Sequence, residues 1–323
     1  MMRATAWAPV NVALIKYWGK RKAKLRLPAN SNLSVCLEQL GTETRVEFKK
    51  GLSEDKVIID GQAARGRERD RVVKHLDRVR DMVKLEFKAK VVSKNNFPKS
   101  VGLSSSASGL AALSLAASKA AGLDLSEKDL SRLARLGSGS ACRSIPGGWV
   151  EWKAGSSDKD SYAETVFSAK HWDVRILVVL LSFEQKRVST TDGHAVAGTS
   201  VFYQERLRWA RRKLREMKRV IEKRDLASFG EVMEDEALNM HAVMLTSRPN
   251  LIYWLPETVR VMQVVQDWRE KGLESYFTIN TGQNVFVFCL PKDEDRLVRR
   301  LKQVKGVIEV RRDRVGRGAR LLT

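Results

Sequence analysis

The first half of the chain begins with segments that alternate apolar and polar residues. Residues 5–15 and 33–49 have the period of two that is typical of half-buried β-strands. Residues 66–84 instead carry apolar positions at helical spacing among many charges, which predicts an amphipathic helix. Residues 87–93 then return to the strand pattern. Because strands and helices follow one another without regular βα alternation, we expect an α+β fold rather than a doubly wound sheet.

Two helices and a buried strand are predicted next. Residues 106–121 are small and apolar on almost every side, which predicts a buried helix. Residues 126–136 place leucines on one face, and Ser126 is a candidate N-cap for that helix. The continuous apolar run at 176–181 has the length and β-branching of a strand that is covered on both faces.

The second half of the chain is mainly helical in pattern, apart from one predicted hairpin. Its expected elements are helices over 201–224, 226–240, 256–271 and 293–304, hairpin strands over 275–281 and 284–290, a strand over 307–311 and a basic tail. The polar stretch from Glu184 to Gly198 is the best candidate for a boundary between domains. We therefore expect two lobes, residues 1–184 and residues 185–323.

Composition narrows the class of protein. The 323 residues are 43% hydrophobic and 30% charged, which excludes a disordered or collagen-like chain. The three cysteines, Cys36, Cys142 and Cys289, lie far apart and do not form the pattern of a disulfide scaffold. The four histidines lack the spacing of zinc ligands. No run of 18 apolar residues occurs, so we expect no membrane helix and a cytoplasmic protein.

The strongest bias in the composition is positive charge. Lys and Arg number 59 against 38 Asp and Glu, a net charge of +21, which indicates anionic partners such as phosphorylated metabolites. Two basic runs, residues 205–224 and 292–320, exceed what one small anionic ligand requires. We interpret them as solvated faces and expect no nucleic-acid partner, because no nucleic-acid motif accompanies the charge. Nucleic-acid binding is the alternative interpretation.

A segment rich in glycine and serine, residues 101–109, comes directly before the predicted buried helix. Free backbone N–H groups, small side chains and a helix N-terminus together favour phosphate binding. Gly102 permits close approach of a phosphate, and Ser104, Ser105 and Ser106 add hydroxyls that can bind phosphate oxygens or Mg²⁺. A plain N-capped helix with a flexible lead-in is the alternative interpretation, and the segment is not a Walker A loop.

A second segment of small residues, 137–148, contains one charged residue, Arg143. Ser138 and Ser140 precede it, and an arginine in so apolar a setting usually has an anionic partner. We interpret the segment as a binding site for a carboxylate or a phosphate. A glycine-rich turn with a solvated arginine is the alternative.

Several motifs in the same order resemble one known family. The N-terminal Ala-Pro-Val-Asn-Val-Ala-Leu-Ile-Lys-Tyr-Trp-Gly-Lys segment at 8–20 and the Gly-Ser-Gly-Ser-Ala-Cys-Arg-Ser run at 137–144 closely resemble mevalonate diphosphate decarboxylases, members of the GHMP kinase superfamily. Further matching segments lie at 27–35, 101–109, 171–172, 188–193 and 280–284. The resemblance implies a lobe like the second domain of ribosomal protein S5, a ferredoxin-like lobe and an active site between them.

The resemblance also implies an activity. The family uses ATP and Mg²⁺ to phosphorylate the tertiary hydroxyl of diphosphomevalonate, and loss of that phosphate and of CO₂ gives isopentenyl diphosphate. This reaction belongs to the mevalonate pathway of isoprenoid biosynthesis. We therefore expect an ATP-dependent decarboxylase that acts on a small mevalonate phosphate, and we expect a homodimer.

Matching motif positions imply roles for individual residues. Lys16, Arg143 and Asn280 are the candidate catalytic residues, with Lys16 beside the reacting hydroxyl. Gly102 and Ser104 to Ser106 would lie at the ATP phosphates, and Ser106 is the candidate metal ligand. The remaining candidates would hold the substrate's diphosphate and carboxylate together with Arg143: they are Tyr17, Lys20, Arg69, Ser138, Ser140 and Thr190.

One motif departs from the family pattern. The family has Asp-Ala-Gly-Pro-Asn where this chain has Asn280-Thr281-Gly282-Gln283-Asn284, so the aspartate beside the tertiary hydroxyl is replaced by an amide. An amide cannot accept a proton as a carboxylate does. Impaired decarboxylation is therefore expected. The alternatives are a mevalonate-type 3-kinase, which phosphorylates the hydroxyl without decarboxylation, and a ligand-binding protein without turnover.

Overall fold

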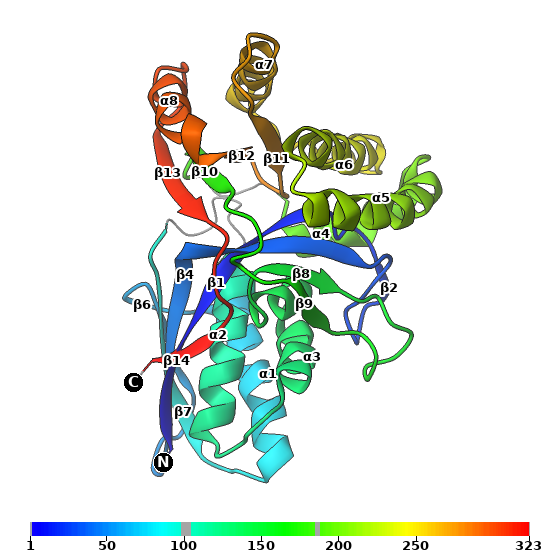
Figure 1. Cartoon of the computed structure of the whole chain (residues 1–323). Coiled ribbons are helices and arrows are strands. Elements are labelled where there is room, and N and C mark those ends of the chain that lie inside the picture. The colour runs from blue at the N-terminus through cyan, green and yellow to red at the C-terminus, as the bar shows by residue number, and fades with distance from the viewer. Residues whose placement is uncertain (1, 98–104, 185–187, 323) are drawn as a thin grey trace.

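The computed structural model describes residues 2–97, 105–184 and 188–322, which form two lobes (Figure 1). The strands of the lower lobe in that view are β1 (Arg3–Ile15), β2 (Lys20–Lys22), β3 (Leu27–Pro28), β4 (Asn32–Lys49), β5 (Lys56–Ile59), β6 (Gln62–Ala63), β7 (Lys88–Asn95), β8 (Trp149–Trp152), β9 (Ala163–Phe167) and β14 (Arg320–Leu322). Its helices are α1 (Gly66–Val83), α2 (Ser105–Ala120), α3 (Glu127–Gly137) and the short 3₁₀ helix η1 (Gly139–Ser144).

The sheet of this lobe has the order β14-β1-β4-β7-β5-β6, and β8 and β9 extend it beside β4. The long strands β1 and β4 pair antiparallel along most of their length, as the alternation predicts. Helices α1, α2 and α3 lie together on one face of the sheet (Figure 1). Alanine, serine and glycine make up most of α2, and such small side chains let its backbone pack closely against β1 and β4. The three helices predicted in this half are confirmed, and the Ser126 side chain caps α3 by accepting from Asp129 N at 3.1 Å.

The second sheet has the antiparallel order β11-β12-β10-β13. Its strands are β10 (Arg175–Leu180), β11 (Tyr276–Ile279), β12 (Val285–Cys289) and β13 (Glu309–Arg314), and the predicted hairpin is β11–β12. The surrounding helices are α4 (Thr190–Val196), the 3₁₀ helix η2 (Ala197–Thr199), α5 (Tyr203–Lys223), α6 (Leu226–Thr246), α7 (Pro256–Glu270) and α8 (Pro291–Lys302).

Strand β10 is buried on both faces of this sheet. Leu177 and Val179 pack in a core with residues of α7 and α8, whereas Ile176 and Val178 pack in a core with residues of α5 and α6. The second of these cores also includes residues of β1 and β4, so it joins the two lobes. A strand that is buried on both sides must be apolar at every position, as the run at 176–181 is.

The chain passes between the two lobes more than once, whereas the sequence predicts a single division between residues 184 and 185. Strand β10 precedes that position but pairs with β12 and β13 in the second sheet. The basic tail returns to the first sheet as β14, which pairs with β1. The polar stretch predicted as the domain boundary contains α4, which lines the cavity between the lobes. Such a stretch is polar because it borders a site, and sequence patterns do not distinguish that from a linker.

Candidate active site

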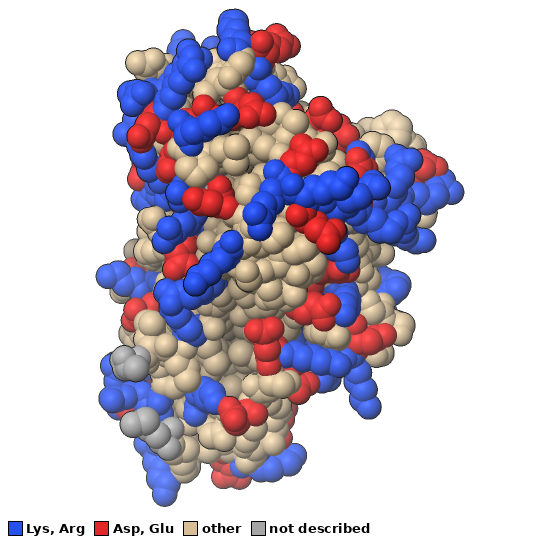
Figure 2. Space-filling model, in the orientation of Figure 1, with Lys and Arg blue, Asp and Glu red and all other residues tan. Residues whose placement is uncertain are grey.

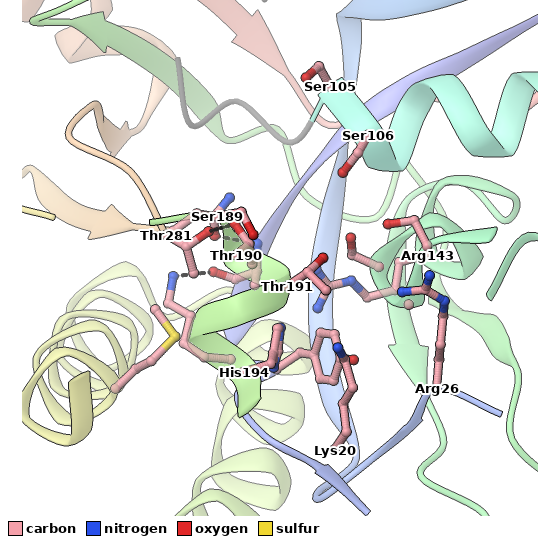
Figure 3. A pocket seen from close by; sticks show the side chains of 18 of the residues that line it. Lys20, Arg26, Ser105, Ser106, Arg143, Ser189, Thr190, Thr191, His194 and Thr281 are labelled. Atoms are coloured by element: carbon pink, nitrogen blue, oxygen red, sulfur yellow. Dashed lines mark hydrogen bonds between the residues drawn. The ribbon is translucent and has the colours of Figure 1, made fainter. Parts of the chain in front are cut away.

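A cavity of about 290 Å³ lies where β1, η1, α2, α4 and the β11–β12 turn meet (Figure 3). Its lining combines several cationic side chains with hydroxyls from five segments that are distant in the sequence. The lining residues are Ala13, Lys16, Tyr17, Lys20, Arg26, Arg71, Ser105, Ser106, Ser138, Gly139, Ser140, Arg143, Ser189, Thr190, Thr191, His194, Met240, Asn280 and Thr281.

Lys16 follows β1 directly and is 1% exposed. Its Nζ donates to Ala13 O and to Thr278 Oγ1, both at 2.6 Å. Burial holds the pKa of Lys16 well below its usual value; Glu236 raises this pKa, and Arg143 and Arg206 lower it further. A lysine in such a setting gains or loses its proton readily when an anion binds beside it.

A buried ion pair holds the backbone of Lys16. Glu236 Oε1 accepts from Lys16 N at 3.2 Å, and Arg206 Nη2 donates to Lys16 O at 3.4 Å. Arg206 and Glu236 bond each other at 2.6 Å, and both side chains are fully buried. The pair therefore fixes both the backbone N–H and the backbone C=O of Lys16. Helices α5 and α6 supply it, at positions about 200 residues from Lys16 in the sequence.

Arg143 lies in η1 and is 4% exposed. Its guanidinium donates to Asn32 Oδ1 at 2.7 Å and to Asn11 Oδ1 at 2.9 Å. Within the described ranges its hydrogen-bond acceptors are amides, and no carboxylate forms an ion pair with it. A buried cation that lacks a counter-charge is costly. Its place on the cavity wall therefore suits an anionic ligand, as the sequence predicts.

Three further cations line the same cavity, namely Lys20, Arg26 and Arg71. Burial lowers the pKa of Lys20, and the neighbouring charges of Arg26 and Arg71 lower it further. Arg69, the residue predicted from the motif, does not line the cavity; its Nη2 bonds Glu54 Oε2 at 2.7 Å. Two residues along a helix rotate a side chain by about 200°, so Arg69 and Arg71 leave α1 on opposite sides.

The N-terminal end of α2 brings Ser105 and Ser106 to the cavity wall (Figure 3). Helix N-termini present free N–H groups and a positive dipole end, which suit phosphate. Gly102 and Ser104 lie outside the described residues. No cluster of metal-ligating His, Cys, Asp or Glu occurs in the described ranges. Mg²⁺ in phosphoryl-transfer sites is held largely by phosphates and water, so a serine hydroxyl such as that of Ser106 fits it.

Asn280 follows β11 and is 8% exposed. Its Oδ1 accepts from Ala13 N at 3.3 Å, and its backbone O bonds His241 Nε2 at 3.0 Å. Its Nδ2 is buried and has no hydrogen-bond partner among the described residues. Since the N–H of Ala13 requires an acceptor, the amide nitrogen is the group left over at the cavity. This position therefore offers a hydrogen-bond donor, where a carboxylate would offer only acceptors.

The other predicted substrate residues Tyr17, Ser138, Ser140 and Thr190 also line the cavity, and Thr190 Oγ1 bonds Thr281 Oγ1 at 2.9 Å. Sequence reasoning missed His194 on α4. Its Nδ1 accepts from Gly19 N at 2.9 Å, and its ring lies 4.2 Å from that of Tyr17. One histidine in a polar stretch gives no pattern, so the sequence carried no signal for it. The other lining residues that were not predicted are Ala13, Arg26, Arg71, Gly139, Ser189, Thr191, Met240 and Thr281.

Comparison with known proteins gives the family. Residues 8–163 match the diphosphomevalonate decarboxylase-like N-terminal domain, and residues 176–317 match the mevalonate 5-diphosphate decarboxylase C-terminal domain. Diphosphomevalonate decarboxylase from Aspergillus fumigatus is 34% identical over 326 residues, which cover 94% of this chain and 81% of that protein. The chain belongs to the diphosphomevalonate decarboxylase family. Phosphomevalonate decarboxylase from Haloferax volcanii is also similar, with 31% identity over 92% of this chain and 91% of that protein.

Solved structures of this family share the fold. Mevalonate diphosphate decarboxylase from Staphylococcus aureus matches with a TM-score of 0.94 and 37% identity over 99% of this chain and 98% of that chain. A structure of MDDEF in complex with MVAPP, AMPPCP and magnesium matches with a TM-score of 0.93 and 39% identity over the same shares. The two-lobed α+β fold of the GHMP kinase type is thereby confirmed. No helix in the described ranges is long and apolar enough to cross a membrane.

Proposed function

We propose that this member of the diphosphomevalonate decarboxylase family is an ATP-dependent decarboxylase of a mevalonate phosphate in isoprenoid biosynthesis. One observation carries the proposal: Lys16, Arg143 and the N-terminal end of α2 meet in a single cavity. A substrate with a carboxylate and a phosphate needs several buried cations, whereas ATP needs a helix N-terminus with small side chains beside it.

The cations of the cavity support a substrate that carries a diphosphate. Lys20, Arg26, Arg71 and Arg143 line the wall, and a diphosphate and a carboxylate together carry several negative charges. Charge repulsion between the cations relaxes when such an anion binds. Relatives named for both phosphomevalonate and diphosphomevalonate share this family. The monophosphate is therefore the second candidate substrate.

The nucleotide would bind at the N-terminal end of α2, with Ser105 and Ser106 at its phosphates and Mg²⁺ beside Ser106. ATP supplies the phosphoryl group that turns the tertiary hydroxyl into a leaving group, and Mg²⁺ offsets the negative charge. The chain's own part would be positioning: the Arg206–Glu236 pair fixes the backbone of Lys16. The Lys16 amine would then lie beside the reacting hydroxyl, as the resemblance implies. Positioning and electrostatics are the main demands of phosphoryl transfer, because its transition state is loose.

Asn280 supports the further proposal that decarboxylation is slow. The resemblance places an aspartate at this position, where it would orient the hydroxyl and offset the positive charge that develops on carbon. The amide can donate from Nδ2 but adds no negative charge. It therefore leaves phosphoryl transfer possible and weakens the step that loses CO₂. A mevalonate-type 3-kinase is the alternative function that an amide at this position leaves open, although the relatives and solved structures compared above are decarboxylases.

An assay with ATP and three substrates tests the proposal. Mevalonate, its 5-phosphate and its 5-diphosphate are supplied in parallel, and ADP and CO₂ are measured separately. The proposal expects ADP formation with the diphosphate and CO₂ release that lags behind it. ADP without any CO₂ supports the kinase, and no ADP with any of the three substrates contradicts both functions. A homodimer and a cytoplasmic location stay predictions from the sequence.

A further inference from the structure

Three cations of the candidate active site, Lys20, Arg26 and Arg71, form a cluster of their own. All three are half-buried and line the cavity. They differ from the Lys and Arg side chains over α5, which Figure 2 shows gathered on the surface at the right of the view, where water and salt screen them. Within the described ranges, no carboxylate forms an ion pair with any member of the cluster. The cluster is therefore a local excess of positive charge on the cavity wall.

The three cations act on one another and not on Lys16. Burial lowers the pKa of Lys20, and the charges of Arg26 and Arg71 lower it further. Burial and then the charge of Arg71 lower the pKa of Arg26 in the same way. Burial also lowers the pKa of Lys16, but no member of the cluster contributes to that shift. The cluster thus lies apart from the buried amine, so a substrate can place its phosphate end at the cluster and its reacting hydroxyl near Lys16.

Arg26 is held in place by its backbone and by one side-chain contact. It ends the turn between β2 and β3, with a left-handed φ of 52° and an N–H that donates to Ala23 O at 3.1 Å. Its Nε donates to Leu136 O, in the last turn of α3, at 3.0 Å. A residue other than glycine in this backbone conformation costs about 1–3 kcal/mol, and such costs recur where a chain clamps a ligand.

The anchored Nε leaves the two terminal nitrogens of the Arg26 guanidinium for a ligand. Neither forms a hydrogen bond or an ion pair with a described residue, and both keep accessible surface. Figure 3 shows the side chains of Lys20 and Arg26 rising together toward the cavity. A guanidinium fixed in this way presents paired N–H donors, which match two oxygens of one phosphate group better than a lysine does.

The charge of the cluster distinguishes a diphosphate from a monophosphate. A phosphate monoester carries about 1.5–2 negative charges at pH 7, which leaves three cations partly uncompensated. A diphosphate adds a second phosphate group, with further negative charge and further acceptor oxygens. The cluster is therefore better matched by a diphosphate.

We infer that Arg26 determines specificity for a diphosphate, and that its terminal nitrogens bind the second phosphate, which a monophosphate lacks. Lys20 and Arg71 are then left for the phosphate that both substrates share. The inference rests on the proposed function, because it names the substrate of that site. A structural cap of α3 is the other role that the bond to Leu136 O allows, and the two roles differ in their effect on ligand preference.

Calorimetry on the full-length protein with diphosphomevalonate and with phosphomevalonate tests the inference. Wild type should bind the diphosphate more tightly. Arg26→Gln should weaken binding of the diphosphate by about tenfold or more, the scale of one charge-assisted hydrogen bond, and binding of the monophosphate by less than about threefold. Arg26→Lys keeps the charge and loses the paired donors, so its preference for the diphosphate should lie between those of wild type and Arg26→Gln. It replaces Arg26→Gln if that variant does not fold.

Arg78→Gln is the matched control, because Arg78 is close enough to act on the charge of Arg26 but does not line the cavity. Water and salt screen such a charge, so the ratio of the two affinities should stay within about twofold of wild type. Equal losses for both ligands in Arg26→Gln leave this residue only the structural cap and overturn the inference. An affinity ratio that is the same in Arg26→Gln and Arg78→Gln overturns it as well.

Inorganic pyrophosphate and phosphate repeat the comparison without the mevalonate part of the substrate. An ATP analogue is present, so that the nucleotide site is occupied. A preference for pyrophosphate that Arg26→Gln removes supports the inference even if no CO₂ is released, in which case the proposed decarboxylation alone fails. Turnover of the monophosphate in place of the diphosphate has the opposite meaning: it overturns the role of Arg26 and leaves a decarboxylase of a mevalonate phosphate.

Discussion

Lys16 and Asn280 bind opposite sides of one residue, Ala13. Lys16 Nζ donates to Ala13 O at 2.6 Å, and Asn280 Oδ1 accepts from Ala13 N at 3.3 Å. Both side chains line the cavity, so strand β1 holds the amine and the amide at a fixed spacing. The chemistry that we propose depends on this relationship, because Lys16 has Glu236 behind it but no carboxylate at position 280.

Arg143 is expected to bind the substrate and not the nucleotide. Replacing it in Arg143→Ala removes a buried cation, which typically costs about 2–5 kcal/mol of binding free energy. Calorimetry should show loss of diphosphomevalonate binding with nearly unchanged binding of an ATP analogue. Arg143→Lys keeps the charge but loses the forked contact to Asn11 and Asn32. Its affinity for diphosphomevalonate should therefore lie between that of wild type and that of Arg143→Ala. Normal substrate binding by Arg143→Ala assigns this residue a structural role.

Ser106 tests the nucleotide site. The side chain is exposed at the first turn of α2, so Ser106→Leu should leave the fold intact while its bulk blocks the approach of phosphate. Binding of an ATP analogue should weaken clearly in calorimetry. Ser106→Ala keeps the space and removes the hydroxyl, so it should raise the Mg²⁺ concentration required for half-maximal activity. Unchanged nucleotide affinity in Ser106→Leu removes this end of α2 from the site.

Glu236 is a positioning residue, and the chain offers a matched control for it. In Glu236→Gln the buried Arg206 loses its counter-charge, which costs about 3–5 kcal/mol of stability. Glu234, on the same helix, forms a comparable ion pair with Arg269 away from the cavity. Both Glu→Gln variants should lower Tm. Glu236→Gln alone should shift the pH profile of kcat, because Glu236 raises the pKa of Lys16. If the two variants have the same pH profile of kcat, Glu236 has only a structural role.

The sequence predicted most elements of the fold because its apolar periodicity is strong. The paired strands β1 and β4, the buried helix α2 and the β11–β12 hairpin all follow from local patterns. The predicted basic tail contains strand β14, which the sequence did not predict. Its pairing with β1 joins residues about 315 positions apart. No local pattern reports such a contact.

The candidate site was predictable where a motif carries the chemistry, as with Lys16 and Arg143. It was not predictable where the fold alone brings a side chain to the cavity. Arg71 lines the wall and Arg69 does not, a difference that depends on which side of α1 faces the cavity. The contact of Glu236 with Lys16 likewise joins distant parts of the chain.

Two of the buried histidines, His75 and His241, predict acid sensitivity. Burial lowers the pKa of His75 and of His241 from 6.5 to about 3, so the folded protein keeps both rings neutral. Below pH 6.5 the unfolded chain takes up these protons first, and stability therefore falls as the pH drops from about 6.5 towards 3. Lowering the pH from 7 to 5 should reduce the free energy of unfolding by about 2 kcal/mol for each of these histidines.

Urea unfolding at pH 7 and at pH 5 measures this loss. His75→Gln should remove about half of the pH-dependent difference, although it weakens the fold at both values because the ring contacts Ser114 Oγ. If His75→Gln does not reduce the pH dependence of stability, the loss of stability at low pH does not arise from the burial of His75.

The ratio of CO₂ released to ADP formed, measured with diphosphomevalonate in wild type and in Asn280→Asp, tests the central claim most directly. The new carboxylate should pair with Lys16 and support the positive charge on carbon. Catalysis by one such group contributes on the order of 10²–10⁴-fold. If Thr281 and Gln283 blunt the gain, Thr281→Ala and Gln283→Pro are added alongside. We predict a ratio well below one in wild type and a marked rise in Asn280→Asp; a wild-type ratio near one, with rapid CO₂ release that Asn280→Asp does not change, would contradict the account.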